Sequence, residues 1–299
     1  MRTLRKKHPI ILSIILVAAF LACDWGVSLA AEYLPYLQTL LPGDLGLSLM
    51  AEGLLFLLLV ILTFALGMGR TFRPGRQGLG ACVLTCLPLL LIYTFAMAAE
   101  LIMISRQPLL PPLEIGIFVA LMLLVGLTEE LLFRGLITRM LYEKFGRTAT
   151  GVWLSVLLSS LLFGTAHLGN AFIGQAPLAG VMVQAAVAAS IGLCLGAIYL
   201  RSRSFWAVAL LHGYLDFCGM ISTGLFGLSQ VEELIGGYTV YNLISVAVYG
   251  AMGLFLLRPS KMKTLTDPEA ATPGGHVVML MLTLLLLVAV VSAVAALLA

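Results

Sequence analysis

The chain has 299 residues, of which 61% are hydrophobic and 10% are charged, and its mean hydropathy is +1.08. This composition excludes an ordinary soluble domain and is typical of a polytopic membrane protein, whose first partner is the lipid bilayer. The net charge of +3 reflects the basic residues that orient a membrane protein and does not indicate a nucleic-acid partner.

Hydropathy, interrupted by Gly, Pro and charged residues, predicts an all-α bundle of eight to nine transmembrane helices, since about 20 apolar residues cross a bilayer. The signal is weakest for the fifth and seventh segments. The segments are 9–31, 46–69, 79–104, 113–137, 151–168, 177–200, 205–225, 239–257 and 276–299. With the N-terminus in the cytoplasm, every Lys and Arg except Arg106 falls in an inner segment. Because cytoplasmic loops carry the excess of basic residues, we expect this orientation.

Residues 121–134 place two adjacent glutamates and an arginine inside an otherwise apolar helix. An ionised side chain near the bilayer centre costs about 2.5–3.5 kcal/mol, so intramembrane carboxylates indicate a functional site. Glu130 and Arg134 are i and i+4, the favoured orientation for an ion pair, and Arg134 is expected to neutralise Glu130. Glu129 is rotated about 100° away, lacks such a partner and is the candidate reactive group. The alternative is a purely structural ion-pair cluster.

The next apolar segment returns antiparallel and carries Phe163 and His167 one helical turn apart. Glu129 lies 19 residues before a turn centred near residue 148, and His167 lies 19 residues after it. At 1.5 Å per residue, both side chains are about 28 Å from the turn, which predicts one shared site. The alternative for a single histidine on an apolar face is a satisfied core residue.

A second polar pair favours the same site, because His212 and Asp216 are i and i+4 on another apolar segment. Several ionisable groups on three apolar helices are costly to bury unless they converge. His212 is shallower than Glu129 in this scheme. The two depths agree if the helix of Glu129 and the following helix extend into the cytoplasm.

Three further carboxylates, Asp24, Glu52 and Glu100, lie near the outer ends of their predicted helices. We expect them to reach headgroups or water, with a proton path as the alternative. The helix predicted over 177–200 is rich in Gly, Ala and Ser, which indicates close helix packing rather than chemistry.

A carboxylate and an imidazole in a partly dry cavity can activate a water for attack on a carbonyl. A second histidine can stabilise the oxyanion or protonate the leaving amine. The rival chemistry is a zinc site built from His167, His212 and a carboxylate. It is disfavoured because no H-E-x-x-H motif is present, and a serine nucleophile lacks its G-x-S-x-G motif. No metal or other cofactor is therefore expected.

Three motifs follow one another in the chain: Glu129-Glu130-x-x-x-Arg134, Phe163-x-x-x-His167 and His212-x-x-x-Asp216. Together they resemble the motifs of the CPBP family, the CAAX proteases and bacteriocin-processing enzymes also called the ABI family. The resemblance covers roughly residues 113–220. It implies a bundle of membrane helices around a conical cavity, and peptide cleavage within the membrane without a required metal.

The resemblance also implies roles for individual residues. The first glutamate of the family and the histidine of its second motif activate water, which corresponds to Glu129 and His167. The second glutamate and the arginine support the site, which corresponds to Glu130 and Arg134, and Phe163 belongs to the supporting residues.

In the third motif, the family's histidine and its Asn or Asp stabilise the oxyanion, which implies that role for His212 and Asp216. Asp216 is the less helpful choice, because an ionised carboxylate only accepts hydrogen bonds. It is either protonated or acts by holding His212.

The sequence therefore predicts an intramembrane glutamic-type endopeptidase for a peptide or membrane-protein substrate, with the oligomeric state left open. Residues 1–112 are expected to hold three N-terminal helices, 113–257 the catalytic core, and 258–299 an inner linker and a C-terminal helix. The likeness to prokaryotic members places it in a prokaryotic cell membrane. The competing class is a membrane scaffold or proton-coupled transporter that uses the same polar cluster, although no repeated halves indicate a transporter.

Overall fold

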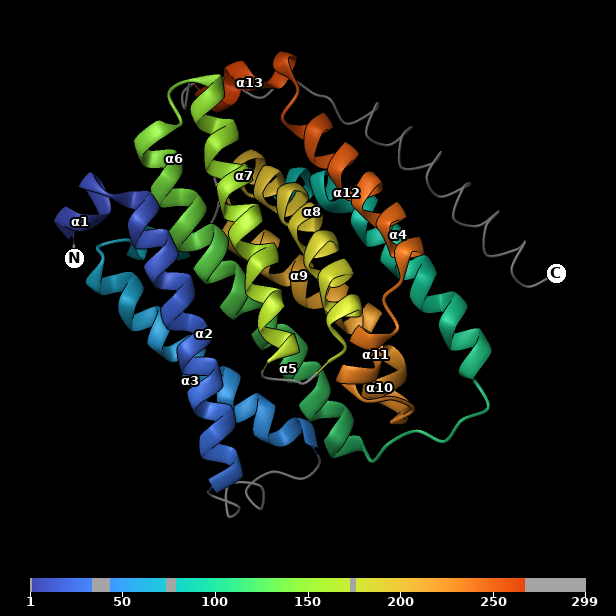
Figure 1. The fold of residues 1–299 in the computed structure, drawn as a ribbon. Helices are drawn as coiled ribbons and strands as arrows, with labels where there is room; N and C mark the ends of the chain where they lie inside the picture. Colours follow the sequence, from blue (N-terminus) through green and yellow to red (C-terminus); the bar gives the residue numbers. More distant parts are fainter. Residues whose placement is uncertain (1, 34–43, 74–78, 173–175, 267–299) are drawn as a thin grey trace.

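The computed structural model describes residues 2–33, 44–73, 79–172 and 176–266, which form helices and no strand (Figure 1). The predicted all-α fold is confirmed. In chain order the elements are α1 (Arg2–Lys7), α2 (Pro9–Tyr33), α3 (Asp44–Ala65), η2 (Gly69–Phe72), α4 (Leu79–Ile104), α5 (Pro112–Glu130), η3 (Leu131–Thr138), α6 (Arg139–Phe145), α7 (Ala149–Ala166), η4 (His167–Ala171), α8 (Leu178–Ser202), α9 (Phe205–Gly219), α10 (Ile221–Phe226), α11 (Val231–Gly236), η5 (Val240–Asn242), α12 (Leu243–Leu256) and α13 (Pro259–Thr266).

Six stretches of the described chain are long and apolar enough to cross a bilayer, and a seventh is counted if α12 and α13, bent by 60°, form one span. The protein is therefore a multi-pass membrane protein. The stretches are Pro9–Val27, Leu45–Ala65, Leu84–Ile104, Pro112–Phe145, Ala149–Ala171 and Leu178–Ser202. The predicted segment 276–299 lies outside the described residues.

Two predicted segments differ from the observed helices in length. The segment 205–225 is two helices, because α9 ends after 15 residues at Gly219 and α10 begins at Ile221. By contrast, the helix that carries the glutamates runs through α5, η3 and α6 for 34 residues. About 20 residues cross the apolar core of a bilayer, so the far end of this 34-residue helix extends beyond the core. This extension is what we expect if Glu129 and His212 lie at the same depth.

The helices that carry the polar motifs pack closely on one another. α5 packs along α9, α7 and α12 pack on α8, and α3 covers α5. A Cβ atom on Gly126 of α5 would meet the backbone of Gly213 and the carbonyl of Ala209 on α9. Glycines at this crossing let two backbones approach, which brings the C-terminal end of α5 beside the middle of α9.

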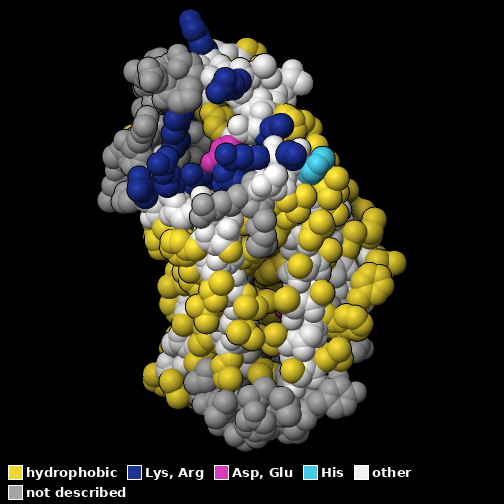
Figure 2. Space-filling view, turned by 90° about the vertical axis from the view of Figure 1, so that its left-hand side faces the viewer, with side chains coloured by type: hydrophobic (Ala, Val, Ile, Leu, Met, Phe, Trp, Pro, Cys, Tyr) yellow, Lys and Arg dark blue, Asp and Glu magenta, His cyan; other side chains and the backbone are white. Residues whose placement is uncertain are grey.

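The surface separates a basic end from an apolar side. α1, α6 and α13 lie at the same end of the bundle, whereas α10 and α11 lie at the other (Figure 1). Figure 2 shows Lys and Arg gathered at one end, above a largely hydrophobic face. This pattern matches a bundle surrounded by lipid with one charged face in water.

Candidate active site

The two glutamates end α5, and the helix continues as the π-helical stretch η3, all of whose residues are buried. Thr138 Oγ1 donates to the carbonyl oxygen of Phe133 at 2.8 Å, and Ser159 Oγ on α7 donates to the same oxygen at 2.9 Å. Single π-helical turns are frequent at functional sites. Here the π-helical stretch begins directly after the two glutamates and contains Arg134 of the same motif, and two hydroxyl groups bind one of its backbone carbonyls.

Glu130 is fully buried, and its Oε1 accepts two hydrogen bonds. Nη1 of Arg134 donates to it at 2.5 Å, and Nδ1 of His212 lies 2.8 Å from it. Arg134 also donates through Nη2 to the carbonyl of Gly192 at 3.1 Å, and its guanidinium lies 4.7 Å from the centre of the Phe163 ring. The expected ion pair is present, and it joins α5 and η3 to α7, α8 and α9.

The two ring nitrogens of His212 have different surroundings: Nδ1 is hydrogen-bonded to buried Glu130, and Nε2 lies near the cavity-lining carboxylates. An ionised carboxylate only accepts hydrogen bonds, so Nδ1 carries a hydrogen toward Glu130. Nε2 lies 3.6 Å from Oε2 of Glu129 and 3.6 Å from Oδ2 of Asp216. Both distances exceed a hydrogen bond, so Nε2 is not tied to either carboxylate.

His167 follows α7, and its ring is oriented by the preceding turn. Its Nδ1 lies 2.9 Å from the carbonyl oxygen of Phe163. Since a carbonyl only accepts, Nδ1 carries the hydrogen and the neutral ring keeps an unprotonated Nε2. The Phe163 ring packs edge-on against the His167 ring, with 4.8 Å between the ring centres, and its centre lies 5.7 Å from that of the His212 ring. Phe163 therefore positions both histidines.

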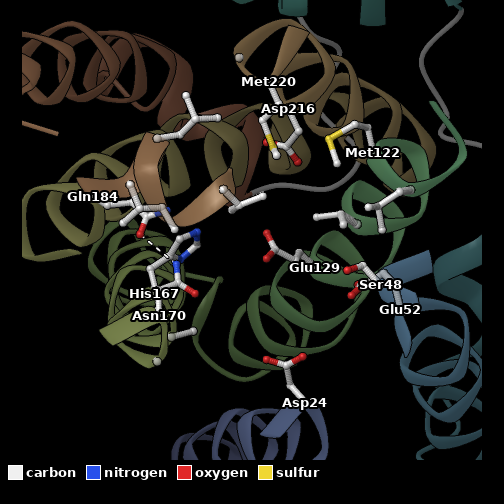
Figure 3. A pocket seen from close by; sticks show the side chains of 18 of the residues that line it. Asp24, Ser48, Glu52, Met122, Glu129, His167, Asn170, Gln184, Asp216 and Met220 are labelled. Atoms are coloured by element: carbon white, nitrogen blue, oxygen red, sulfur yellow. Dashed lines mark hydrogen bonds between the residues drawn. The ribbon is translucent and has the colours of Figure 1, made fainter. Parts of the chain in front are cut away.

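Glu129, His167, His212 and Asp216 line one cavity of about 870 Å³. Figure 3 shows the carboxylate of Glu129 projecting into this space, with His167 and Asp216 on its borders. The predicted convergence of the three motifs is thus observed. Glu129 keeps 21% of its side-chain surface exposed, whereas Glu130 keeps none, which distinguishes the adjacent carboxylates.

Two carboxylates from the N-terminal helices also line this cavity, namely Asp24 of α2 and Glu52 of α3 (Figure 3). The sequence alone led us to expect contact with headgroups or water, whereas the structure places both side chains in the wall of this cavity. α3 packs against α5, so the outer part of α3 faces the cavity rather than lipid. Oε1 of Glu52 is buried and has no hydrogen-bond partner among the described residues.

Sequence reasoning also missed an amide pair in the cavity wall. Asn170 Nδ2 donates to Oε1 of Gln184 at 2.9 Å, and both residues line the cavity (Figure 3). The helix of Gln184 had been interpreted as packing alone. A single glutamine in an otherwise apolar span was the available signal, because such a side chain needs a partner.

The cavity lining is acidic. It includes Glu233 besides the four carboxylates already named, and no Lys or Arg is among its described residues. In the described part of the chain, no three His, Cys, Asp or Glu side chains are arranged to hold a metal ion. Metal independence of the reaction stays a prediction.

The family comparison covers the same part of the chain as the motifs. A family model described as "Type II CAAX prenyl endopeptidase Rce1-like" matches residues 111–218, from the start of α5 to the end of α9. The chain matches no curated protein and no solved structure. The helices α2 and α3, which supply Asp24 and Glu52, lie outside the matched segment. Residues 111–218 therefore form an Rce1-like type II CAAX prenyl endopeptidase domain, consistent with the CPBP family.

Proposed function

We propose that this protein is an intramembrane endopeptidase that hydrolyses a peptide bond with a water activated by Glu129 and His167. One observation carries the proposal: both residues and the His212–Asp216 pair belong to the segment matched by the Rce1-like family model and line a single cavity. Its volume of about 870 Å³ is in the range of pockets that enclose a substrate. The substrate class is a peptide or membrane protein.

In the proposed reaction, Glu129 is the general base. Its carboxylate takes a proton from a water, and the water oxygen attacks the carbonyl carbon of the scissile bond. His167 holds this water through its unprotonated Nε2, since its Nδ1 is bound to the carbonyl of Phe163. Glu129 then passes the proton to the leaving nitrogen, so that the C–N bond breaks and two peptide ends are released. No metal takes part, and a chelator is expected to leave cleavage unchanged.

His212 stabilises the oxyanion in this scheme. Its Nδ1 hydrogen bond to Glu130 fixes the ring, and its doubly protonated form donates from Nε2 to the developing charge. Glu130, Glu129 and Asp216 surround the ring and compensate the positive charge. Arg134 in turn compensates Glu130, so the pair positions His212 without reacting.

We further propose that the basic end is cytoplasmic and that the host membrane is a prokaryotic cell membrane. α1 is at this end, because Nη2 of Arg5 lies 3.7 Å from Oε2 of Glu143 on α6. The positive-inside rule then places the N-terminus in the cytoplasm. Labelling of single cysteines placed in α1 and in α11 from either side of the membrane tests this orientation.

The proposed activity is tested by comparing new protein N-termini in membranes that contain wild-type protein, Glu129→Gln or His167→Ala. Glu114→Gln is the matched control, because it makes the same change in the first turn of the same helix, outside the cavity. Termini found with wild type and Glu114→Gln but absent from both site variants support cleavage and identify the substrate. Identical profiles, with equal amounts of folded protein, refute it and favour a scaffold or transporter.

A further inference from the structure

A second cavity, of about 300 Å³, lies at the basic end of the molecule and shares no lining residue with the catalytic cavity. Four arginines from separate parts of the chain line it: Arg70 and Arg73 at η2, Arg139 at the start of α6, and Arg203 after α8. Its volume is at the lower end of pockets that hold small ligands. The family match and the proposed reaction assign no function to this cavity.

The acidic residues of the described lining do not neutralise the positive charge of its four arginines. Glu143 is the one acidic residue among the described residues of the wall, and Nε of Arg139 lies 3.0 Å from its Oε1. Glu143 also pairs with Arg5 at 3.7 Å. Arg70 and Arg73 are exposed and form no ion pair with a described residue. At least two guanidinium groups therefore remain for an anion.

The wall is held in place by the surrounding protein. Arg139 Nη1 donates to Oγ1 of Thr71 at 2.8 Å, and that hydroxyl donates to the carbonyl of Gly135 at 3.1 Å. Arg203 is the single non-glycine residue with a positive φ, 52°, in the described chain. Non-glycine residues in this conformation are strained and often occur at binding sites. Tyr199 also lines the cavity, and its hydroxyl forms no hydrogen bond with a described residue.

The neighbouring residues place this cavity at the level where lipid headgroups lie. Trp206 follows the lining residue Phe205, is partly exposed, and donates Nε1–H to the carbonyl of Phe72 at 3.0 Å. Tryptophan is enriched at membrane–water interfaces. The basic end lies directly above the hydrophobic face (Figure 2). Basic pockets between membrane helices at this level bind anionic headgroups.

We propose that this arginine-lined cavity binds a phosphate group. Guanidinium groups bind phosphate oxygens in pairs of parallel hydrogen bonds, and two of these arginines have no competing carboxylate. An anionic lipid headgroup and free inorganic phosphate present the same chemistry. The position at the membrane interface favours the headgroup.

The test uses the full chain, purified in detergent, with phosphatidylglycerol, phosphatidylcholine and inorganic phosphate as separate probes whose binding is measured by native mass spectrometry. The site variant is Arg70→Gln/Arg73→Gln. The control is Lys144→Gln/Arg147→Gln, which removes the same charge from exposed positions outside the cavity. If each arginine contact with a bound phosphate contributes about 1 kcal/mol, the figure for a basic residue beside an anionic headgroup, loss of two contacts weakens binding about 25-fold, whereas the control residues lie outside the cavity and lose no such contact.

We expect phosphatidylglycerol to bind more tightly than phosphatidylcholine, with the 25-fold loss in the site variant and less than about a twofold loss in the control. Inorganic phosphate that binds with the same dependence on Arg70 and Arg73 supports the phosphate site and identifies the free anion as its source. Equal losses in the two double variants, or no loss in the site variant, overturn the proposal. Tyr199→Phe, which removes only one hydroxyl, is expected to weaken binding severalfold without affecting folding.

Discussion

Replacement of Arg134 by glutamine is expected to destabilise the protein by about 3–4 kcal/mol. Removing one partner of a buried ion pair costs about 3–5 kcal/mol, because the other charge stays buried without compensation. His212 continues to donate to Glu130, which moves the cost toward the lower limit. The lost hydrogen bond to Gly192 adds about 1 kcal/mol.

Thermal unfolding of purified protein measures this effect. For a chain of this size, 1 kcal/mol corresponds to about 2–4 °C, so the unfolding temperature of Arg134→Gln should fall by about 10 °C. Glu143→Gln is the control in the following helix, because this carboxylate is 41% exposed and its removal leaves the hydrogen bond from Arg139 to Thr71 in place. Exposed pairs contribute about 0–1 kcal/mol, which corresponds to no more than about 4 °C.

Equal shifts in the two variants would refute the reasoning that burial makes the Glu130–Arg134 pair important. The double variant Glu130→Gln/Arg134→Gln provides a further check, because it leaves no uncompensated carboxylate. It should unfold at a higher temperature than Arg134→Gln alone. A double variant less stable than the single one would show that the cost comes from lost packing and not from the stranded charge.

Three further outcomes are expected. Asp216→Asn and Asp216→Ala should slow cleavage to a similar degree, by about 10-fold to 100-fold, because neither side chain compensates the positive charge of His212; an Asp216→Asn rate equal to that of the wild type would contradict this role. Gly126→Val should lower the unfolding temperature more than Gly116→Val in the same helix, since a Cβ at 126 meets the α9 backbone and one at 116 meets nothing within 4 Å; equal shifts would contradict close packing. Because the cavity is acidic, peptides with Lys near the scissile bond should be cleaved faster than those with Glu, and Glu52→Gln should reduce this ratio; an unchanged ratio would exclude charge recognition by Glu52.

The position of Glu129 and His167 in one cavity could be predicted from helix geometry, and the π-helical stretch η3 between Glu129 and the turn does not remove Glu129 from it. Two antiparallel helices joined near residue 148 place equally distant residues at equal depth, and the rise per residue is fixed. The Glu130–Arg134 pair is equally local. The hydrogen bond between Glu130 and His212 joins residues 82 positions apart, and no periodicity in the chain specifies which helices are neighbours.

The positions of Asp24 and Glu52 in the cavity wall were not predicted, and the reason is physical. Hydropathy reports that α2 and α3 are apolar, but nearly every face of such a helix is apolar, so the pattern does not reveal which side meets the protein. Asp24 and Glu52 were assigned to the interface from their depth alone. Their exposure to the cavity depends on how α3 rotates against α5 and how α2 packs on α3, which are properties of packing.

In the proposed mechanism the adjacent glutamates could not exchange their roles. Successive residues on a helix point about 100° apart, so Glu130 can face the core while Glu129 faces the cavity. Arg134 and His212 are both hydrogen-bonded to Oε1 of Glu130. Glu130 would lose this positioning role if its carboxylate were exposed to water. Glu129 has the opposite requirement, because a general base must reach the substrate. In the proposed mechanism the pair therefore separates support from reaction within one turn of helix, and His212 is the residue that joins them, bound to one carboxylate and facing the other.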